Sequence, residues 1–198
     1  NSHHYLEQTL NSVRAQSVKP TEILVVDDGS TDPETVRALD AIRGVKLLRM
    51  GNLGLSGARN VGVFGAKTRW VLPLDSDDLL EPAFIERALD ASARSPRAAY
   101  ITSFMMCFRD EDPAQRMVYI PLGFERDLLP VWNCGGPCTG LIDRAAAVAV
   151  NAYDLAMDAF EDWDLWCGLA RAGNSSVVVP EFLILNRIRA SSMLRTLT

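Results

Sequence analysis

Apolar positions along this 198-residue chain switch between helical spacing and short continuous runs. Leu6, Leu10 and Val13 recur three and four residues apart, as on one face of a helix, and an apolar run at residues 23–26 follows Pro20. The same alternation continues along the chain. It predicts further helices at residues 33–43, 56–67, 82–95, 143–153 and 160–172, and further strands at residues 45–50, 69–74, 98–108, 175–180 and 182–189.

Strands that alternate with helices at this spacing predict an α/β fold with a mostly parallel central sheet flanked by helices. The chain is 48% hydrophobic, which is enough for the core of one domain over residues 1–198. Residues 109–138 break the pattern and are rich in Pro, Gly and Trp. They predict a loop region over one rim of the sheet.

Charge and composition narrow the class of protein. Twenty Lys and Arg residues lie scattered among 25 Asp and Glu residues, and the formal net charge is -5, so no basic stripe suits a nucleic-acid-binding protein. No apolar run reaches the roughly 18 residues needed to cross a bilayer, and we expect a soluble domain. Four irregularly spaced cysteines favour a reducing compartment over a disulfide scaffold.

Acidic side chains follow two of the predicted strands. Asp27 and Asp28 come directly after the strand at residues 23–26, and Asp75, Asp77 and Asp78 follow another apolar run. Because ligands of α/β sheets gather at the carboxyl ends of strands, we expect both clusters to lie on one rim. Carboxylate oxygens are the ligands that Mg²⁺ and Mn²⁺ prefer. On these residues alone a metal site and a solvated acidic turn both stay open.

Four stretches, in this order and spacing, carry a resemblance to a known family. They are VVDDGSTD at residues 25–32, GLSGARNVGV at 54–63, LPLDSDDLLEP at 72–82 and EDWDLW at 161–166. Together they resemble the inverting glycosyltransferases of family 2. The resemblance implies a GT-A fold, the Rossmann-like fold of nucleotide-diphospho-sugar transferases.

The resemblance also implies roles for individual residues. Asp28 would contact the base of a nucleotide-sugar donor, usually a uridine one, and Arg59 would lie near the base or the diphosphate. Asp75 and Asp77 would form the DxD motif that holds Mn²⁺ or Mg²⁺, with Asp77 the direct ligand and Asp75 serving the ribose or metal-bound water. Asp162 would be the catalytic base that takes the proton of an acceptor hydroxyl.

Further candidates stand beside these residues. Glu161 and Trp163 flank Asp162 and are candidates for contact with the sugar or the acceptor, with core packing as the alternative for Trp163. Arg189 stands where members of the family often have a histidine metal ligand. Because arginine binds phosphate oxygens but cannot ligate a cation, we expect Arg187 or Arg189 to pair with the diphosphate. The alternative is a surface arginine pair on an edge strand.

Members of the family normally begin with a strand that ends in a Tyr-Asn pair, and this chain starts at Asn1, where that pair would end. The resemblance therefore implies a central strand ahead of Asn1 and a domain truncated at its N-terminus. An unpaired edge would otherwise lie inside the fold.

Two functions from different classes fit these residues. The first is an enzyme that moves a sugar from a nucleotide-diphosphate donor, most often a UDP-sugar, to an acceptor hydroxyl on a glycan or lipid-linked molecule. The second is a catalytically silent domain that binds a nucleotide sugar or a glycan. Many relatives act on lipid carriers or cell-surface polysaccharide, which would place this domain in the cytoplasm, at the inner face of the membrane.

Overall fold

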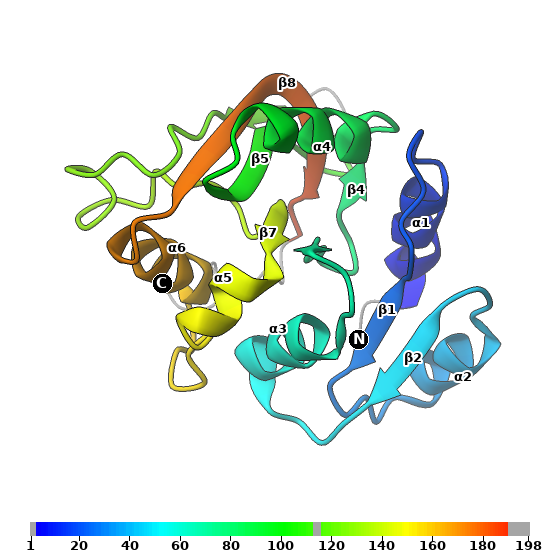
Figure 1. The fold of residues 1–198 in the computed structure, drawn as a ribbon. Helices are drawn as coiled ribbons and strands as arrows, with labels where there is room; N and C mark the ends of the chain where they lie inside the picture. The colour runs from blue at the N-terminus through cyan, green and yellow to red at the C-terminus, as the bar shows by residue number, and fades with distance from the viewer. Residues whose placement is uncertain (1–2, 113–115, 190–198) are drawn as a thin grey trace.

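The computed structural model describes residues 3–112 and 116–189 (Figure 1). Helices surround a central sheet, and the predicted helix positions are confirmed to within a few residues at their ends. The helices are α1 (His3–Arg14), α2 (Pro33–Ala41), α3 (Gly54–Gly65), α4 (Phe84–Arg94), α5 (Arg144–Ala149) and α6 (Glu161–Arg171).

The strands form two sheets among the described residues. A parallel pair stands apart from a six-stranded sheet whose main path has the order β3-β7-β5-β8-β4, with β6 added to β5. The strands are β1 (Leu24–Asp27), β2 (Lys46–Arg49), β3 (Trp70–Val71), β4 (Leu79–Leu80), β5 (Ala98–Phe108), β6 (Met117–Tyr119), β7 (Leu141–Asp143) and β8 (Ser175–Arg187). The strand expected ahead of Asn1 is not tested by these residues and stays a prediction.

The prediction of a mostly parallel sheet is wrong, because the larger sheet is mixed. Only β5 and β8 pair in parallel there, while β3 with β7, β4 with β8, β5 with β6 and β5 with β7 are antiparallel. Parallel neighbours need a long crossover, usually a helix, and α6 precedes β8 in this way. β6 follows β5 after a short connection that allows only an antiparallel return. The apolar pattern reports strands but not their directions.

Strand β8 continues through Pro180, where the sequence predicts two strands. Proline donates no ladder hydrogen bond, so a strand interior accepts it only at an irregularity. The register with β5 shifts at this point, from Ser103 opposite Val179 to Phe104 opposite Phe182. The bulge absorbs Pro180 and lets one strand cross the whole sheet.

The two faces of the six-stranded sheet carry two apolar clusters. Successive residues of a strand point to opposite faces, and Tyr100 and Ile101 of β5 accordingly belong to different clusters. Helix α4 covers the face with Ile101, and α3, α5 and α6 cover the face with Tyr100 (Figure 1). Trp166 of α6 stacks on Tyr100, with 3.9 Å between the ring centroids. This stacking fixes α6 against the sheet.

Gly140, just before β7, lies where no side chain fits. A Cβ there would come within 2.4 Å of Tyr100 Cε2 and 2.8 Å of the Ile101 carbonyl oxygen, which belongs to the backbone and cannot turn away. We expect Gly140→Ala to lower the free energy of unfolding by about 1–3 kcal/mol through overpacking. Urea denaturation measures this change. Gly62→Ala is the matched control, because a Cβ there meets nothing within 4 Å inside helix α3, and it should be neutral or stabilising.

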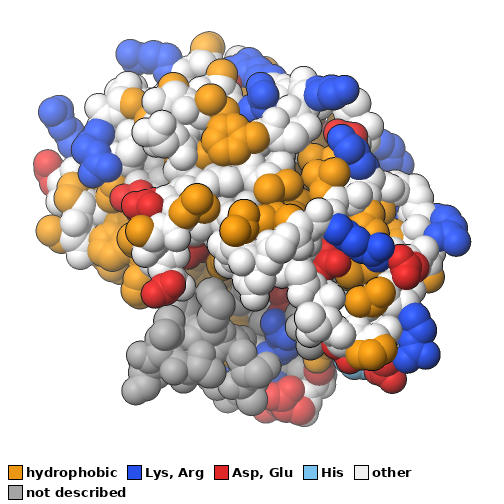
Figure 2. Space-filling view, turned by 90° about the horizontal axis from the view of Figure 1, so that it is seen from below, with side chains coloured by type: hydrophobic (Ala, Val, Ile, Leu, Met, Phe, Trp, Pro, Cys, Tyr) orange, Lys and Arg blue, Asp and Glu red, His pale blue; other side chains and the backbone are white. Residues whose placement is uncertain are grey.

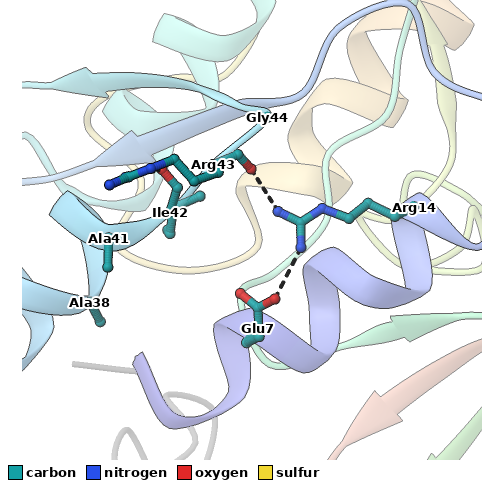
Figure 3. Close-up of a pocket in the computed structure, with 7 residues that line it drawn as sticks. All are labelled: Glu7, Arg14, Ala38, Ala41, Ile42, Arg43 and Gly44. Carbon is teal, nitrogen blue, oxygen red and sulfur yellow. Dashed lines mark hydrogen bonds and ion pairs between the residues drawn. The ribbon is translucent and has the colours of Figure 1, made fainter.

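A surface hollow of about 500 Å³ lies between α1 and α2 (Figure 3). Arg14 of α1 donates to Glu7 Oε1 at 3.0 Å and to the Arg43 carbonyl oxygen at 2.8 Å, which closes one end of it. None of the carboxylates proposed for catalysis from the sequence lines this hollow. It is therefore a packing feature of the helix pair rather than the candidate active site.

Lys and Arg side chains form no continuous stripe on the face drawn in Figure 2, where charged and apolar side chains are interspersed. This distribution fits the formal net charge of -5. Within the described residues, no helix is both long and apolar enough to span a membrane.

Candidate active site

The first turn of α6 carries the predicted base. Glu161 and Asp162 begin this helix, and Leu165, Trp166 and Leu169 of its apolar face are buried. These three residues recur at helical spacing and form one apolar face. Because the apolar face anchors the helix in the core, the N-terminal turn is fixed at the edge of the core and leaves Asp162 half-buried.

Asp162 has a perturbed acidity. Burial raises its pKa to about 6, and the negative charge of Glu161 adds to the shift, while Arg59 opposes it. One carboxylate oxygen accepts a hydrogen bond from the Trp163 backbone N–H at 2.7 Å. A carboxylate with a pKa close to neutral can hold a proton that it has taken from a hydroxyl group. Perturbed groups of this kind gather at active sites.

Arg59 of α3 joins the two acidic motifs. Its side chain is 9% exposed, and its two terminal nitrogens donate to Asp75 Oδ1 at 2.9 Å and to Glu161 Oε1. The Glu161 side chain is also buried, at 8% exposure. Asp75 comes from the stretch after β3 and Glu161 from the start of α6, so this arginine holds together two motifs that are far apart in the chain.

Asn60 of α3 holds the segment that leads to α6. Its side-chain amide donates to the Tyr153 carbonyl at 2.7 Å and accepts from the Tyr153 N–H at 2.9 Å. Among the described residues, the non-glycine residues with positive φ are Asn151, Ala152 and Phe160, all between α5 and α6. Each such conformation costs about 1–3 kcal/mol and persists only where its surroundings impose it. Asn60 supplies part of that constraint just ahead of the predicted base.

The acidic stretch at residues 75–78 lies between β3 and β4. The Asp77 side chain is 11% exposed, and its Oδ2 is 2.6 Å from Nε of Arg189. Burial raises the pKa of Asp77, and the charge of Asp75 adds to this, while Arg189 opposes it. The stretch therefore concentrates negative charge that two arginines, Arg59 and Arg189, partly balance.

Asp78 has a different role from its neighbours. Its two oxygens accept from the Asn186 side chain at 3.1 and 3.0 Å, and Oδ1 accepts from the Arg187 backbone N–H at 2.9 Å. Burial raises its pKa to about 7, with Asp75 adding to the shift. Asp78 thus fastens β4 to the end of β8.

Arg187 is buried among protein partners. Its guanidinium donates to the Asp77 carbonyl at 3.0 Å, to Gln8 Oε1 at 2.8 Å and to Asp110, and it lies 4.4 Å from the Tyr5 ring centroid. These contacts connect α1, the end of β8 and the 75–78 stretch. Arg189 is more accessible, with 28% of its side chain exposed. The continuation of this segment, residues 190–193, lies outside the described residues.

Asp27 and Asp28 mark the carboxyl end of β1. Asp27 is buried, accepts from the Ser30 N–H at 2.9 Å and pairs with Arg49. Asp28 is half-buried, and its Oδ1 accepts from the Leu53 N–H at 2.7 Å. Asp27 therefore shapes the turn, and the nucleobase contact of Asp28 stays a prediction.

Residues 117–132, which we name the 117–132 segment, contact α6 at Trp163, the residue after Asp162. The segment exposes the large apolar side chains of Met117, Val118, Ile120, Leu122, Leu128, Val131 and Trp132. Burial, followed by the charge of Asp162, raises the pKa of Tyr119 to about 12. Trp163 Nε1 donates to the Leu129 carbonyl at 2.7 Å. Trp163 thereby packs against the segment from the α6 side.

The donor set of Asp75 and Asp77 fits a hard divalent cation. Both offer carboxylate oxygens, and Asp75 keeps 41% of its side chain exposed. Within the described residues no third His, Cys or acidic side chain completes a cluster with them. Mg²⁺ and Mn²⁺ suit such a site, because Mg²⁺ in particular keeps several waters and shares its coordination with phosphate oxygens. Arg59 and Arg189 lie beside these carboxylates, and arginine is a side chain that pairs with phosphate oxygens.

Residues 1–146 match the sequence model of the glycosyl transferase family 2. The chain belongs to this family. The putative teichuronic acid biosynthesis glycosyltransferase TuaG of Bacillus subtilis is 26% identical over 198 residues, covering 98% of this chain and 77% of TuaG. The succinoglycan biosynthesis protein ExoO of Rhizobium meliloti is 38% identical over 93 residues, covering 46% of this chain and 26% of ExoO. The matched region is thus about a quarter of that relative's length.

The crystal structure of S. aureus TarS superposes with a TM-score of 0.75 at 20% identity, over 95% of this chain and 35% of that one. This likeness supports the α/β GT-A fold, with the mixed sheet described above. The family expected from the four sequence stretches is confirmed. The roles of individual residues in this glycosyltransferase family member are proposals.

Sequence reasoning missed Asn60 and the bridging position of Arg59. Both lie in the GLSGARNVGV stretch, which carried the family resemblance, so a signal was present. Their partners, Tyr153, Glu161 and Asp75, are distant in the chain. Only the fold reveals these contacts.

Proposed function

We propose that residues 1–198 act as one inverting glycosyltransferase domain, which moves a sugar from a nucleotide-diphosphate donor, most often a UDP-sugar, to an acceptor hydroxyl. The observation that carries the proposal is Asp162, a half-buried carboxylate with a pKa of about 6 at the start of α6. It lies within electrostatic range of Asp75, the first acid of the DxD stretch. The carboxylate proposed to act on the acceptor and the carboxylates proposed to bind the donor thus belong to one site.

In this reaction Asp162 takes the proton of the acceptor hydroxyl. The hydroxyl oxygen forms a bond to the anomeric carbon as the bond from that carbon to the diphosphate oxygen breaks. The diphosphate leaves with the electron pair. Attack from the face opposite the leaving group inverts the anomeric carbon.

Donor binding is assigned to the residues around the DxD stretch. Asp28 contacts the nucleobase, and Asp75 and Asp77 hold Mn²⁺ or Mg²⁺, with Asp75 also near the ribose. When bound, such an ion neutralises the charge that develops on the departing diphosphate. Of the two arginines, Arg189 is assigned to the diphosphate, because 28% of its side chain is exposed, whereas Arg187 is buried and bonds to Asp77, Gln8 and Asp110.

Arg59 and Glu161 are assigned positioning roles that differ from the sequence predictions. Arg59 was expected near the base or the diphosphate, and Glu161 at the sugar or acceptor. Their mutual ion pair is buried, so neither is displayed freely to a ligand. They hold the first turn of α6 against the DxD stretch. Trp163 was also expected at the sugar or acceptor. We retain that proposal, because Trp163 is half-buried and follows the base in the chain.

The acceptor side lies over the 117–132 segment. This segment contacts α6 at Trp163, the residue after the proposed base, and its exposed apolar side chains favour an acceptor with an apolar part, such as a lipid-linked glycan. TuaG and ExoO carry names from teichuronic acid and succinoglycan biosynthesis, and polysaccharide biosynthesis is the proposed setting here. Action at the cytoplasmic face of the membrane follows from such an acceptor.

Calorimetric titration of UDP, GDP and dTDP, with and without Mn²⁺, tests the donor side. We expect one nucleotide to bind in a metal-dependent way, and Asp77→Ala to lose the metal-dependent part of the affinity. Asp164→Asn, which alters an acid in the same turn of α6 as the base, is the control and should bind like the wild type. If a folded protein binds none of the three nucleotides, the transferase proposal is wrong.

A catalytically silent sugar-binding domain is the competing function. It also predicts metal-dependent nucleotide binding, so binding alone does not separate the two. Donor turnover does: a transferase releases nucleoside diphosphate and depends on Asp162, whereas a silent domain releases none with any acceptor.

A further inference from the structure

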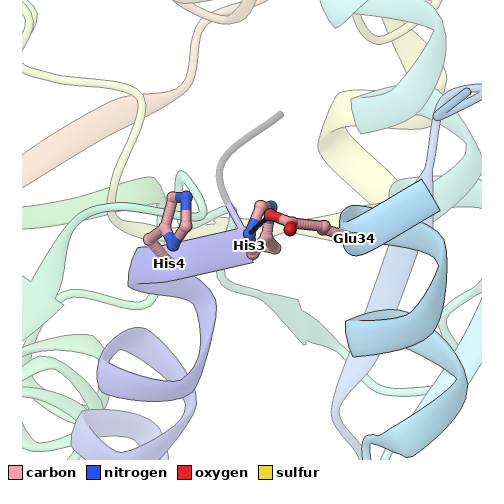
Figure 4. A group of neighbouring side chains, drawn as sticks. All are labelled: His3, His4 and Glu34. Atoms are coloured by element: carbon pink, nitrogen blue, oxygen red, sulfur yellow. Dashed lines mark ion pairs between the residues drawn. The ribbon is translucent and has the colours of Figure 1, made fainter. Parts of the chain in front are cut away.

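Two histidines and a glutamate lie together where the first turns of α1 and α2 meet (Figure 4). One ligand atom from each of His3, His4 and Glu34 lies within 4.8 Å of the other two. His3 is half-buried, while His4 and Glu34 are exposed. These are the only histidines in the chain, and the proposed sugar transfer uses none of the three residues.

A chain of hydrogen bonds fixes the orientation of the His3 ring. Thr35 Oγ1 donates its hydrogen to Asp32 Oδ2 at 2.7 Å, so it can only accept from His3 Nδ1, which lies 2.9 Å away. The hydrogen of neutral His3 is therefore on Nδ1, and the lone pair is on Nε2. Nε2 faces Glu34 Oε2 at 3.7 Å. A histidine that binds a metal usually has its other ring nitrogen fixed in this way.

The donor set suits a transition metal. Two imidazole nitrogens and one carboxylate make a common three-ligand set for Zn²⁺, with water as the fourth ligand. With bond lengths of about 2.0–2.1 Å and tetrahedral angles, ligand atoms lie about 3.4 Å apart. The separation of 3.7 Å between His3 Nε2 and Glu34 Oε2 is close to that value, and both side chains are near enough to the surface to adjust.

A simple ion pair between His3 and Glu34 explains less of this arrangement. It requires protonated His3, and it leaves His4 without a role. The two rings lie with their centroids 3.8 Å apart, so two imidazolium charges would repel each other strongly. Two neutral rings that share one cation with the Glu34 carboxylate avoid this repulsion.

We propose that His3, His4 and Glu34 bind a divalent transition-metal ion of the Zn²⁺ class. The ion would join the first turn of α1 to the first turn of α2. Arg14 already joins the other end of α1 to the chain just after α2, through the Arg43 carbonyl. The site is separate from Asp75 and Asp77, whose oxygen ligands select Mg²⁺ or Mn²⁺.

The test is a titration of ZnCl₂ into the full chain without any histidine affinity tag, in buffer with excess Mg²⁺ to occupy the carboxylate site. Calorimetry gives the stoichiometry, and NMR of the imidazole groups reports on this site alone, because the chain has two histidines. We expect one bound ion, with shifts of both imidazole rings.

Three test variants and two controls separate this site from others. Glu34→Gln and His4→Ala should each weaken Zn²⁺ binding at least about 10-fold, and Thr35→Val, which frees the His3 ring, about 10- to 100-fold. Glu7→Gln is the matched control, since Glu7 is as exposed on α1 as Glu34 is on α2. Asp77→Asn should bind Zn²⁺ like the wild type. Thr35 and Asp77 are buried, so thermal unfolding must check that each variant folds.

Unchanged imidazole signals on saturation with Zn²⁺, or full affinity in both Glu34→Gln and His4→Ala, would overturn the proposal. Loss of affinity in Asp77→Asn would assign the ion to the DxD stretch instead and also overturn it. Because this readout is binding alone, its result is independent of the proposed transferase activity.

Discussion

Replacing Asp162 with asparagine is expected to lower kcat about 10²- to 10⁴-fold, the range that a general base contributes. Asparagine has the same shape and can accept the same hydrogen bond from the Trp163 N–H, but it cannot take a proton. The affinity for the nucleotide donor should stay unchanged, because Asp162 acts on the acceptor. Release of nucleoside diphosphate measures kcat, and calorimetry measures donor affinity.

Asp164→Asn is the control for this substitution, because Asp164 lies in the same first turn of α6. It should change kcat less than about 10-fold, since it holds no proton in the reaction. A kcat of Asp162→Asn within that same range would contradict the assignment of Asp162 as the base.

The pH dependence provides a second readout on the base. Asp162 must be unprotonated to act, so kcat/KM of the wild type should fall about tenfold per pH unit below its pKa of about 6. Glu161 raises that pKa, so Glu161→Gln should move the midpoint to lower pH. If the midpoint of the pH profile does not move, the charge of Glu161 does not influence the pKa of Asp162.

Arg59→Met is expected to lower the free energy of unfolding by about 3–5 kcal/mol, the cost of removing one partner of a buried ion pair. Methionine keeps much of the volume but leaves Glu161 buried without its counter-ion. The contact that joins α3 to both acidic motifs is lost at the same time. Urea denaturation followed by fluorescence of the four tryptophans measures the change.

Two further variants make this result specific. Arg69→Met removes an arginine that is 60% exposed and paired with Asp143, and it should cost at most about 1 kcal/mol. The double variant of Arg59→Met with Glu161→Gln removes both buried charges and should recover part of the lost stability. Equal losses of unfolding free energy in the Arg59 and Arg69 variants would mean that the buried ion pair stabilises the fold no more than the exposed one.

Local patterns were sufficient for the helices and most strands of the fold. Helix α2 is an example: its predicted start at residue 33 is confirmed, and Asp32 Oδ2 caps it by accepting from the Thr35 N–H at 2.8 Å. The short strands β4, β6 and β7 were missed, because two or three residues carry no period. Their existence depends on pairing, β4 with β8, β6 with β5, and β7 with β3 and β5.

By itself the sequence determined the α/β class, the order of the helices and of most strands, and the motifs that identify the glycosyltransferase family. Those features rest on short-range spacing, which each segment carries alone. Only the tertiary structure decided the mixed directions of the sheet, the burial of Arg187, the bridge from Arg59 to Asp75 and Glu161, and the raised pKa of Asp162. Each of these depends on groups that are distant in the chain and meet only when burial and long-range pairing bring them together.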